Sequence, residues 1–298
     1  MHARPRAKVN LTLKVGPRGR DGYHPLQSVF LRIGLADELV VAFGNNQGSD
    51  VLTVSGLPGC EVDGNLVLSA FRATRRALGQ DLAPLVAHLD KRIPIGAGLG
   101  GGSADAASAV DCALQMWGAG LSPELRNAVA LELGADVPFF ADNVDAALVS
   151  GRGESIEARS VTAGLGLLLV TPPIAMSTAA VFARFDELAL DSTFVEFKTP
   201  DLARLPETYA GLRDGNDLWP AAVALAPQLG TLRDDLERLS GRPWLMSGSG
   251  STLFAIYESG PEAVSSGRAL VASESESLGG ALINAVDLVG PDPLWRYP

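Results

Sequence analysis

The chain opens with a strict alternation of apolar and polar residues. Between residues 7 and 15 every odd position is Ala, Val or Leu, and the even positions are Lys, Asn, Thr and Lys. Because successive side chains of a strand point to opposite faces, this pattern predicts a half-buried strand with one polar face. Lys8 and Asn10 lie on that face, roughly 7 Å apart.

Further along the chain, short apolar runs alternate with helical patterns. The runs typical of strands cover 28–33, 38–43, 86–89, 146–149, 165–170, 253–257 and 281–286. The stretches typical of helices cover 65–76, 104–117, 122–134, 177–188, 218–226 and 229–239. The mixture predicts an α+β fold with mostly antiparallel sheets, in two lobes. We place the division around 158–166, which gives an N-terminal domain of residues 1–160 and a C-terminal domain of residues 161–298.

The helix expected after residue 103 is rich in small side chains. Ala or Ser occupies six of the ten positions from 104 to 113. Small side chains let a helix approach its neighbours closely. We therefore expect this helix to be central in its lobe.

Composition limits the class of protein. With 298 residues, 47% hydrophobic and 19% charged, the chain is globular and long enough to bury a core without disulfides or metal. Cys60 and Cys112 form no C-x-x-C pair, which favours a reducing, cytoplasmic setting. No apolar run approaches the ~18 residues of a membrane span, and residues 1–8 do not resemble a signal peptide.

The charge is acidic overall but uneven. A net charge of −10 argues against a protein that binds nucleic acid or a membrane surface. Six cations nonetheless lie within the first twenty residues. They form either a solvated edge or a positive field for an anionic ligand.

The strongest chemical signal is the segment from Pro94 to Ala104. Five glycines within seven residues expose the backbone N–H groups, and a helix begins directly afterwards. Such N–H groups and the positive end of a helix together favour a bound phosphate. A flexible linker is the alternative, but linkers do not normally lead straight into a long helix.

Two other phosphate-binding loops fit this segment less well. Residues 96–101 satisfy the dinucleotide pattern G-x-G-x-x-G, but residues 90–94 are not the buried parallel strand that should precede it. A Walker A loop ends in Gly-Lys-Ser/Thr, whereas Gly102 is followed directly by Ser103.

Other polar residues carry candidate chemistry. Asp136 lies between a helix end and the apolar run 137–140, where a carboxylate serves equally well as a catalytic base or a helix cap. Lys8 is either a solvated strand lysine or, if it faces Asp136, a cation that neutralises a transferred phosphoryl group. Tyr23 and His24 either cover the sheet or hold a nucleobase by stacking and edge hydrogen bonds.

The motifs together resemble the GHMP kinases (galacto-, homoserine, mevalonate and phosphomevalonate kinases). The glycine segment is similar to the second motif of that family, Ser247 to Thr252 is similar to the third, and residues 7–11 fall where the first is expected. Four ordered motifs resemble the members that act on a cytidylated methylerythritol: Lys8-x-Asn10-Leu11, Asp21-Gly22-Tyr23-His24, residues 98–107 and residues 134–140. The resemblance extends from residue 7 to about residue 257.

The resemblance implies a two-lobed kinase with the ATP and substrate cleft between the lobes. It implies transfer of the γ-phosphoryl group of ATP to the 2-hydroxyl of 4-diphosphocytidyl-2-C-methyl-D-erythritol, in the non-mevalonate route to isoprenoid precursors. Mg²⁺ is implied by this reaction; its protein ligands stay open, with Ser103 as a guess.

The implied catalytic residues are Lys8 and Asp136. The implied acceptor-binding residues are Asn10, Tyr23, His24, Thr178 and Phe182, with Phe185 as the alternative second aromatic. The implied nucleotide-binding residues are Asn65, which by itself signals only a helix cap, and Pro94, Ile95, Gly96, Ala97, Gly98, Leu99, Gly100, Gly101, Gly102, Ser103 and Ala104.

Two rival functions fit many of the same residues. A GHMP kinase for homoserine or a mevalonate derivative would share the phosphate loop, but the Tyr23-His24 pair argues against it. A catalytically silent nucleotide-binding regulator would share the fold, although the presence of Lys8 and Asp136 argues against that. We expect a small-molecule partner, with no nucleic acid and no membrane.

Overall fold

A computed structural model describes residues 1–20, 22–45, 48–58, 62, 64–188 and 199–288, and the backbone of 293–297. Asp21 and Cys60 lie outside the described residues. The chain divides into two compact units, and each is discontinuous in sequence. Unit 1 comprises residues 1–7, 35–95 and 100–144, and unit 2 comprises residues 8–34, 96–99 and 145–298.

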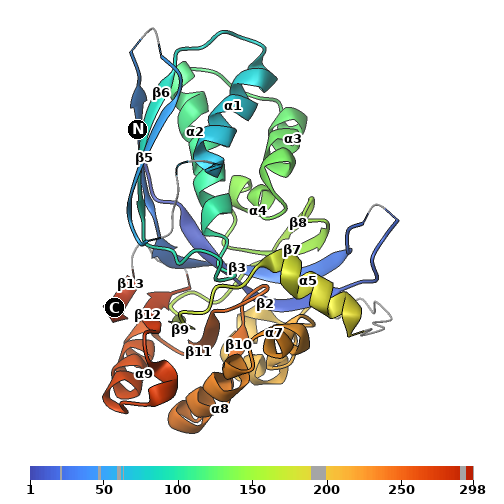
Figure 1. Cartoon of the computed structure of the whole chain (residues 1–298), viewed down its shortest axis with the longest axis vertical. Coiled ribbons are helices and arrows are strands. Elements are labelled where there is room, and N and C mark those ends of the chain that lie inside the picture. The colour runs from blue at the N-terminus through green and yellow to red at the C-terminus, as the bar shows by residue number, and fades with distance from the viewer. Residues whose placement is uncertain are drawn as a thin grey trace. The chain divides into compact units, whose positions relative to one another are not determined.

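Unit 1 is a sheet covered by helices. Its strand order is β1-β4-β6-β5, with β4 antiparallel and β5 parallel to β6. The helices α1 and α2 pack against the sheet, and α3 and α4 pack onto these two helices (Figure 1). The small-residue helix is α2, and its contacts with α1, α3, α4 and β4 confirm that it is central. The elements are β1 (His2–Ala3), β4 (Glu38–Phe43), β5 (Val51–Gly56), β6 (Leu85–Lys91), α1 (Leu66–Leu78), α2 (Gly101–Trp117), α3 (Pro123–Leu133) and α4 (Val137–Ala141).

Unit 2 contains a five-stranded sheet of order β10-β11-β9-β12-β13 and most of a four-stranded sheet of order β2-β3-β7-β8. The strand β9 is antiparallel to both β11 and β12 and is buried along its whole length. Its helices include α9, which packs on β9 and β12, and α7, which contacts α5 and α8 (Figure 1). The strands are β2 (Arg6–Val15), β3 (Leu26–Ala36), β7 (Ala146–Gly151), β8 (Ser155–Ala158), β9 (Gly166–Thr171), β10 (Leu245–Met246), β11 (Leu253–Tyr257), β12 (Leu282–Asp287) and β13 (Pro293–Tyr297). The helices are α5 (Thr178–Glu187), α6 (Leu205–Thr208), α7 (Trp219–Leu225), α8 (Gln228–Ser240) and α9 (Gly260–Ala272), with short 3₁₀ turns at Leu202–Arg204, Tyr209–Leu212 and Glu276–Leu278.

The core of unit 2 lies between its five-stranded sheet and the helices. Leu168, Leu253 and Trp244 are among its buried members, and Trp244 is fully inaccessible to solvent. Such burial removes apolar surface from water and stabilises the sheet that supports the candidate site.

Two expectations differ from the structure. The prediction of a half-buried first strand is wrong, because Lys8, Asn10 and Thr12 on its polar face are only 3%, 3% and 2% exposed. The expected division near residue 160 does not coincide with the two compact units, because β3 pairs with β7 and so joins residues 8–34 to unit 2. Among the described residues, no helix is both long and apolar enough to cross a membrane.

Candidate active site

Lys8 and Asn10 lie at the start of β2 with their polar atoms paired. Lys8 Nζ donates to Asn10 Oδ1 at 2.5 Å and to the Gly98 carbonyl at 3.1 Å, and it lies 4.7 Å from the centroid of the Phe30 ring. Asn10 Nδ2 donates to Ser28 Oγ at 2.9 Å. These partners compensate for the loss of water around a buried ammonium group and a buried amide.

The part of the glycine loop that belongs to unit 2 is bonded to this strand. The Lys8 N–H donates to the Leu99 carbonyl at 3.0 Å. Gly96 and Gly98 adopt φ angles of 64° and 77°, in the left-handed region. A Cβ atom on Gly98 would lie 2.1 Å from the Ser247 carbonyl oxygen, so only glycine fits at this position.

The turn from Ser247 to Thr252 completes the arrangement. Ser247 Oγ accepts a hydrogen bond from the Asn10 N–H at 3.2 Å and donates one to the Gly98 carbonyl at 2.8 Å. The Thr252 N–H donates to the Ala97 carbonyl at 3.2 Å. The turn therefore meets the glycine loop. We call residues 8–10, 96–99 and 247–252 the motif junction.

The remainder of the glycine segment belongs to unit 1 and leads into α2. Gly100 is the N-cap residue of α2, with a φ of 68°. Gly100 has no side chain to cap this helix end, and the first turn of α2 contains no acidic residue. The first-turn N–H groups and the helix dipole are thus suited to an anionic ligand.

A buried ionic cluster lies at the same end of α2. Lys91 Nζ donates to Asp105 Oδ2 at 2.7 Å and also to Asp37. Asp37 in turn accepts the Ile93 N–H at 2.8 Å, which fixes the chain where it leaves β6. A Cβ atom on Gly101 would lie 3.3 Å from Lys91 Nζ, so the cluster directly supports the first residue of α2.

Burial dominates the protonation of this cluster. It raises the pKa of Asp105 to about 7, an effect that the Lys91 ammonium opposes and the Asp37 charge reinforces. Burial acts to lower the pKa of Lys91, but the two carboxylates outweigh it and raise that pKa above its usual value. Asp105 Oδ1 is buried and accepts no hydrogen bond from the described part of the chain. The cluster is therefore neutral when Asp105 is protonated and carries one negative charge when it is not.

Asp136 belongs to unit 1 and precedes the short helix α4. It occupies the N-cap position, but its side chain makes no capping hydrogen bond. The helix-cap interpretation of Asp136 is therefore wrong. A Cβ atom on Gly134 would lie 3.9 Å from Ser103 Oγ, which places the first turn of α2 beside the segment that carries Asp136.

His24 lies in a separate group of unit 2. Its Nδ1 is 2.8 Å from the Gly16 carbonyl oxygen, and its Nε2 is 3.2 Å from Asp186 Oδ1. The imidazole centroid is 5.3 Å from that of Phe182 and 6.0 Å from that of Phe185. Both ring nitrogens lie near acceptors of the protein; a contact between the imidazole and a nucleobase stays a prediction.

The neighbouring aromatic residues differ in exposure. Phe185 is buried in the core of unit 2, whereas Phe182 is only partly buried at its margin. Tyr23 is 56% exposed, and the guanidinium carbon of Arg152 lies 3.7 Å from its ring centroid. Phe182 and Tyr23 are therefore the aromatic residues of this group that solvent reaches. Nothing in the sequence around Arg152 marks it as a partner of Tyr23.

Two further predicted residues lie at helix starts. Thr178 begins α5, and its Oγ1 is 3.0 Å from Ser249 Oγ in the motif junction. Asn65 is the N-cap residue of α1, and its Oδ1 accepts the Val67 N–H at 2.9 Å. The predicted helix cap is confirmed; a role of Asn65 near the nucleotide stays a prediction.

Comparison with known proteins identifies the family. The family model "GHMP kinases N terminal domain" matches residues 65–143, which include α2 and Asp136. A 4-diphosphocytidyl-2-C-methyl-D-erythritol kinase of Gluconacetobacter diazotrophicus is 38% identical over 269 residues, 87% of this chain and 87% of its own. The chain belongs to this kinase family. A member from Brucella melitensis is 37% identical over 84% of each chain.

A solved structure of the family agrees with the fold. The crystal structure of a 4-(cytidine 5'-diphospho)-2C-methyl-D-erythritol kinase superimposes with a TM-score of 0.73 at 32% identity, covering 96% of this chain and 99% of that one. The resemblance to the GHMP kinases and the mixed α+β fold with antiparallel sheets are both confirmed. The motif junction is therefore interpreted as part of a kinase of this family.

Proposed function

We propose that this chain transfers the γ-phosphoryl group of ATP to the 2-hydroxyl of 4-diphosphocytidyl-2-C-methyl-D-erythritol, giving ADP and the 2-phosphate for isoprenoid precursor synthesis. The motif junction carries the proposal. Segments 90 and 237 residues apart meet there through the hydrogen bonds of Lys8, Asn10 and Ser247. Relatives with this kinase name over most of the chain support the substrate class. A cytoplasmic site of action is part of the same proposal.

The glycine segment is assigned to the ATP phosphates. Left-handed conformations at Gly96, Gly98 and Gly100 turn backbone N–H groups away from a regular helix or strand. The uncapped end of α2 adds its dipole, which favours negative charge. From Gly96 to Gly102 five of the seven residues are glycine, so few side chains compete for this surface; Ile95, 49% exposed, lies just before it.

Lys8 and Asp136 are assigned to the transfer itself. Phosphoryl transfer depends on alignment and charge neutralisation more than on early proton removal. The Lys8 ammonium group, fixed by Asn10 and the Gly98 carbonyl, supplies positive charge to the transferred group. Asp136 orients the acceptor hydroxyl and receives its proton late in the transfer.

The cytidine end of the acceptor is assigned to the aromatic group. Tyr23, which is 56% exposed, and Phe182, which is partly buried, supply aromatic rings for stacking on the base. The contacts of His24 with the Gly16 carbonyl and the Asp186 carboxylate fix its imidazole, which packs beside the Phe182 ring. Asn10 and Thr178 supply polar groups for the remainder of the acceptor.

Mg²⁺ is assigned to the nucleotide phosphates. Among the described residues, no group of three or more His, Cys, Asp or Glu side chains is placed to hold a metal ion. An ion bound mainly by phosphates and water, with the Ser103 hydroxyl as a protein oxygen on α2, fits this arrangement. When bound, it neutralises phosphate charge during the transfer.

The experiment that tests the proposal is ADP release with Mg-ATP against four acceptors. These are 4-diphosphocytidyl-2-C-methyl-D-erythritol, homoserine, mevalonate and galactose, and we expect turnover on the cytidylated acceptor alone. Turnover on another acceptor would keep the phosphate loop and discard the cytidine assignment. Turnover on none of them would leave a nucleotide-binding protein without this activity.

Variants test the two catalytic assignments. Asp136→Asn and Lys8→Met should each lower kcat by at least ~100-fold while the Kd for ATP stays within about threefold of wild type. Asp142→Asn, at the other end of α4, is the matched control and should retain wild-type kcat. An active Asp136→Asn enzyme would remove that residue from the mechanism.

A further inference from the structure

A short segment outside the recognised motifs runs beside β2. The Leu13 N–H donates to the Gly215 carbonyl at 2.9 Å, and the Asp217 N–H donates to the Leu13 carbonyl at 2.8 Å. Leu13 and Asn216 form a parallel bridge. The Asp217 carboxylate also accepts the Val15 N–H at 3.0 Å. Residues 215–217 therefore form a single parallel β-bridge with β2.

The Asn216 side chain reaches away from this pairing to the motif junction. Its Nδ2 donates to the carbonyls of Met246 and Gly248 at 2.9 and 2.8 Å, and its Oδ1 accepts the Leu218 N–H at 3.0 Å. The residue is 7% exposed. The two carbonyls flank Ser247, so one amide group fixes the turn on both sides of that residue.

The turn that Asn216 holds is in contact with the proposed catalytic strand. Ser247 Oγ bonds the Asn10 N–H and the Gly98 carbonyl. A Cβ atom on Gly248 would lie 3.2 Å from Asn10 Oδ1, the same oxygen that accepts from Lys8 Nζ. A displacement of residues 246–248 would therefore also displace the Lys8 ammonium group and residues 96–99 of the glycine loop, all within unit 2.

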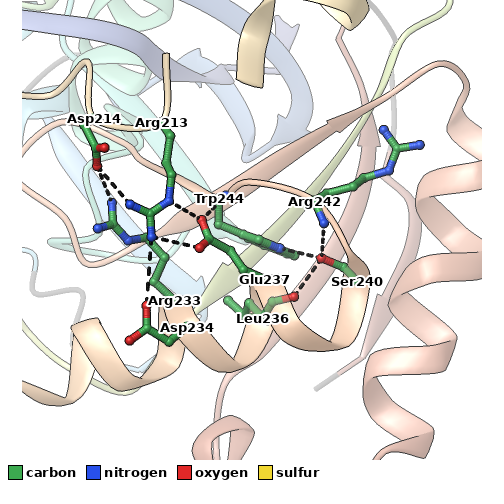
Figure 2. A network of polar contacts seen from close by, with 9 residues as sticks. All are labelled: Arg213, Asp214, Arg233, Asp234, Leu236, Glu237, Ser240, Arg242 and Trp244. Atoms are coloured by element: carbon green, nitrogen blue, oxygen red, sulfur yellow. Dashed lines mark hydrogen bonds and ion pairs between the residues drawn. The ribbon is translucent and has the colours of Figure 1, made fainter. Parts of the chain in front are cut away.

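An ionic network anchors both partners of this contact. Figure 2 shows Glu237 between Arg213, three residues before Asn216, and Trp244, two residues before Met246. Arg213 donates two hydrogen bonds to the Glu237 carboxylate at 2.7 and 2.8 Å, and the Trp244 N–H donates at 3.1 Å. Burial acts to raise the pKa of Glu237, but these hydrogen bonds outweigh it and hold that pKa below its usual value. One carboxylate on α8 thus fixes the chain on both sides of the Asn216 contact.

We propose that Asn216 is a positioning residue for phosphoryl transfer, holding the turn at 246–248 against Asn10 and thereby the Lys8 ammonium. This inference rests on the proposed function. A residue in this role contributes alignment and makes no contact with ATP itself, because its amide donors bind protein carbonyls and its oxygen accepts the Leu218 N–H. A misplacement of about 1 Å in a catalytic group lowers turnover by on the order of 100-fold.

The test compares Asn216→Ala and Asn216→Asp with Asn284→Ala. The first removes both donors, and the second keeps the shape but sets a carboxylate oxygen against the carbonyls. Asn284, on β12, is 1% exposed and its Oδ1 has no hydrogen-bond partner in the described chain, so it controls for the loss of a buried amide. We expect both Asn216 variants to fold, with kcat lowered ~30- to 100-fold and KM for ATP within about threefold. We expect Asn284→Ala to stay within about threefold in kcat.

Hydrogen–deuterium exchange gives a second measurement that does not require turnover. In both Asn216 variants, amides of residues 8–13 and 245–252 should exchange at least ~10-fold faster than in wild type, with α9 unchanged. Wild-type kcat in a folded Asn216→Ala enzyme would overturn the inference and leave the proposed function standing. Loss of folding in both Asn216 variants would also overturn it, because the residue would then serve stability alone. If wild-type protein lacks turnover, the proposed function fails, and unchanged exchange at these amides would still overturn the positioning role.

Discussion

The buried cluster at the start of α2 makes the stability of this protein depend on pH in a defined direction. The pKa of Asp105 is raised to about 7 in the folded chain. Between its usual value of 3.8 and 7 the folded state therefore binds a proton that the unfolded state has released. Stability from this group is complete at low pH and is lost as the pH rises through the folded pKa.

Asp105→Asn isolates this effect, because an amide has the shape of the protonated acid and does not titrate. Each pH unit of pKa displacement is worth about 1.4 kcal/mol, so the penalty in the wild-type chain reaches at most ~4 kcal/mol above pH 7. We expect the free energy of unfolding of Asp105→Asn, relative to wild type, to increase between pH 4 and pH 7.5 by up to that amount. Lys91 stays protonated throughout, since its pKa is raised.

The assay is urea unfolding at several pH values, with m checked for constancy so that the two proteins share a denatured state. Groups that do not interact with Asp105 contribute to both chains and cancel in the difference, so the pH-dependent remainder belongs to the Asp105–Lys91–Asp37 cluster. Asp142→Asn removes an exposed carboxylate of the same unit and controls for the loss of one charge. A difference between Asp105→Asn and wild type that stays flat, or that shrinks as the pH rises, would refute the reasoning.

Three further predictions concern unit 2. Gly98→Ala should lower the free energy of unfolding by at least ~2 kcal/mol and remove most turnover, because the new Cβ atom meets the Ser247 carbonyl. Gly118→Ala is the control, since Gly118 has a similar φ of 62° but open space around it. Thermal unfolding should show a loss nearer ~1 kcal/mol for this control. Phe182→Ala should raise KM for the cytidylated acceptor ~10-fold without changing KM for ATP, whereas Phe185→Ala should mainly lower the unfolding free energy, by ~3–5 kcal/mol. In urea unfolding, Glu237→Gln should have a free energy of unfolding ~1–2 kcal/mol below that of wild type at pH 7. The two free energies should converge as the pH falls through the lowered pKa of Glu237. A stability gap that persists at acidic pH would contradict the last of these.

Local sequence signals were sufficient for elements that depend on their own residues. The strand β11 spans Leu253–Tyr257, as predicted, because a short apolar run needs no distant information to be recognised. The helix α1 begins directly after Asn65, whose cap was visible in the sequence. The helix α9 is not predicted from the sequence although Ser259 caps it and a proline follows, because the weak helix formers Ser265, Ser266 and Gly267 interrupt its pattern.

The candidate site depends on contacts that periodicity cannot reveal. The polar face of β2 appeared solvent-exposed in the sequence, yet Lys8 and Asn10 are buried by partners 90 and 237 residues away. Nothing near Asn216 in the sequence indicates that its amide spans two carbonyls of a distant turn. The resemblance to a kinase family located the motifs, but the hydrogen bonds between them come only from the structure.

The distance between Asn10 and Ser247 along the chain also governs when the site can form during synthesis. At about 5–20 residues per second, a ribosome needs roughly 10–50 s to produce the 237 residues that separate them. From the synthesis of Asp136 onward, the emerging chain has Lys8, the glycine segment and Asp136 but lacks the turn that fixes Asn10 and Gly98. A nascent chain of this length therefore contains the proposed catalytic side chains without their alignment, and catalytic competence is acquired only once residues 247–252 have been translated.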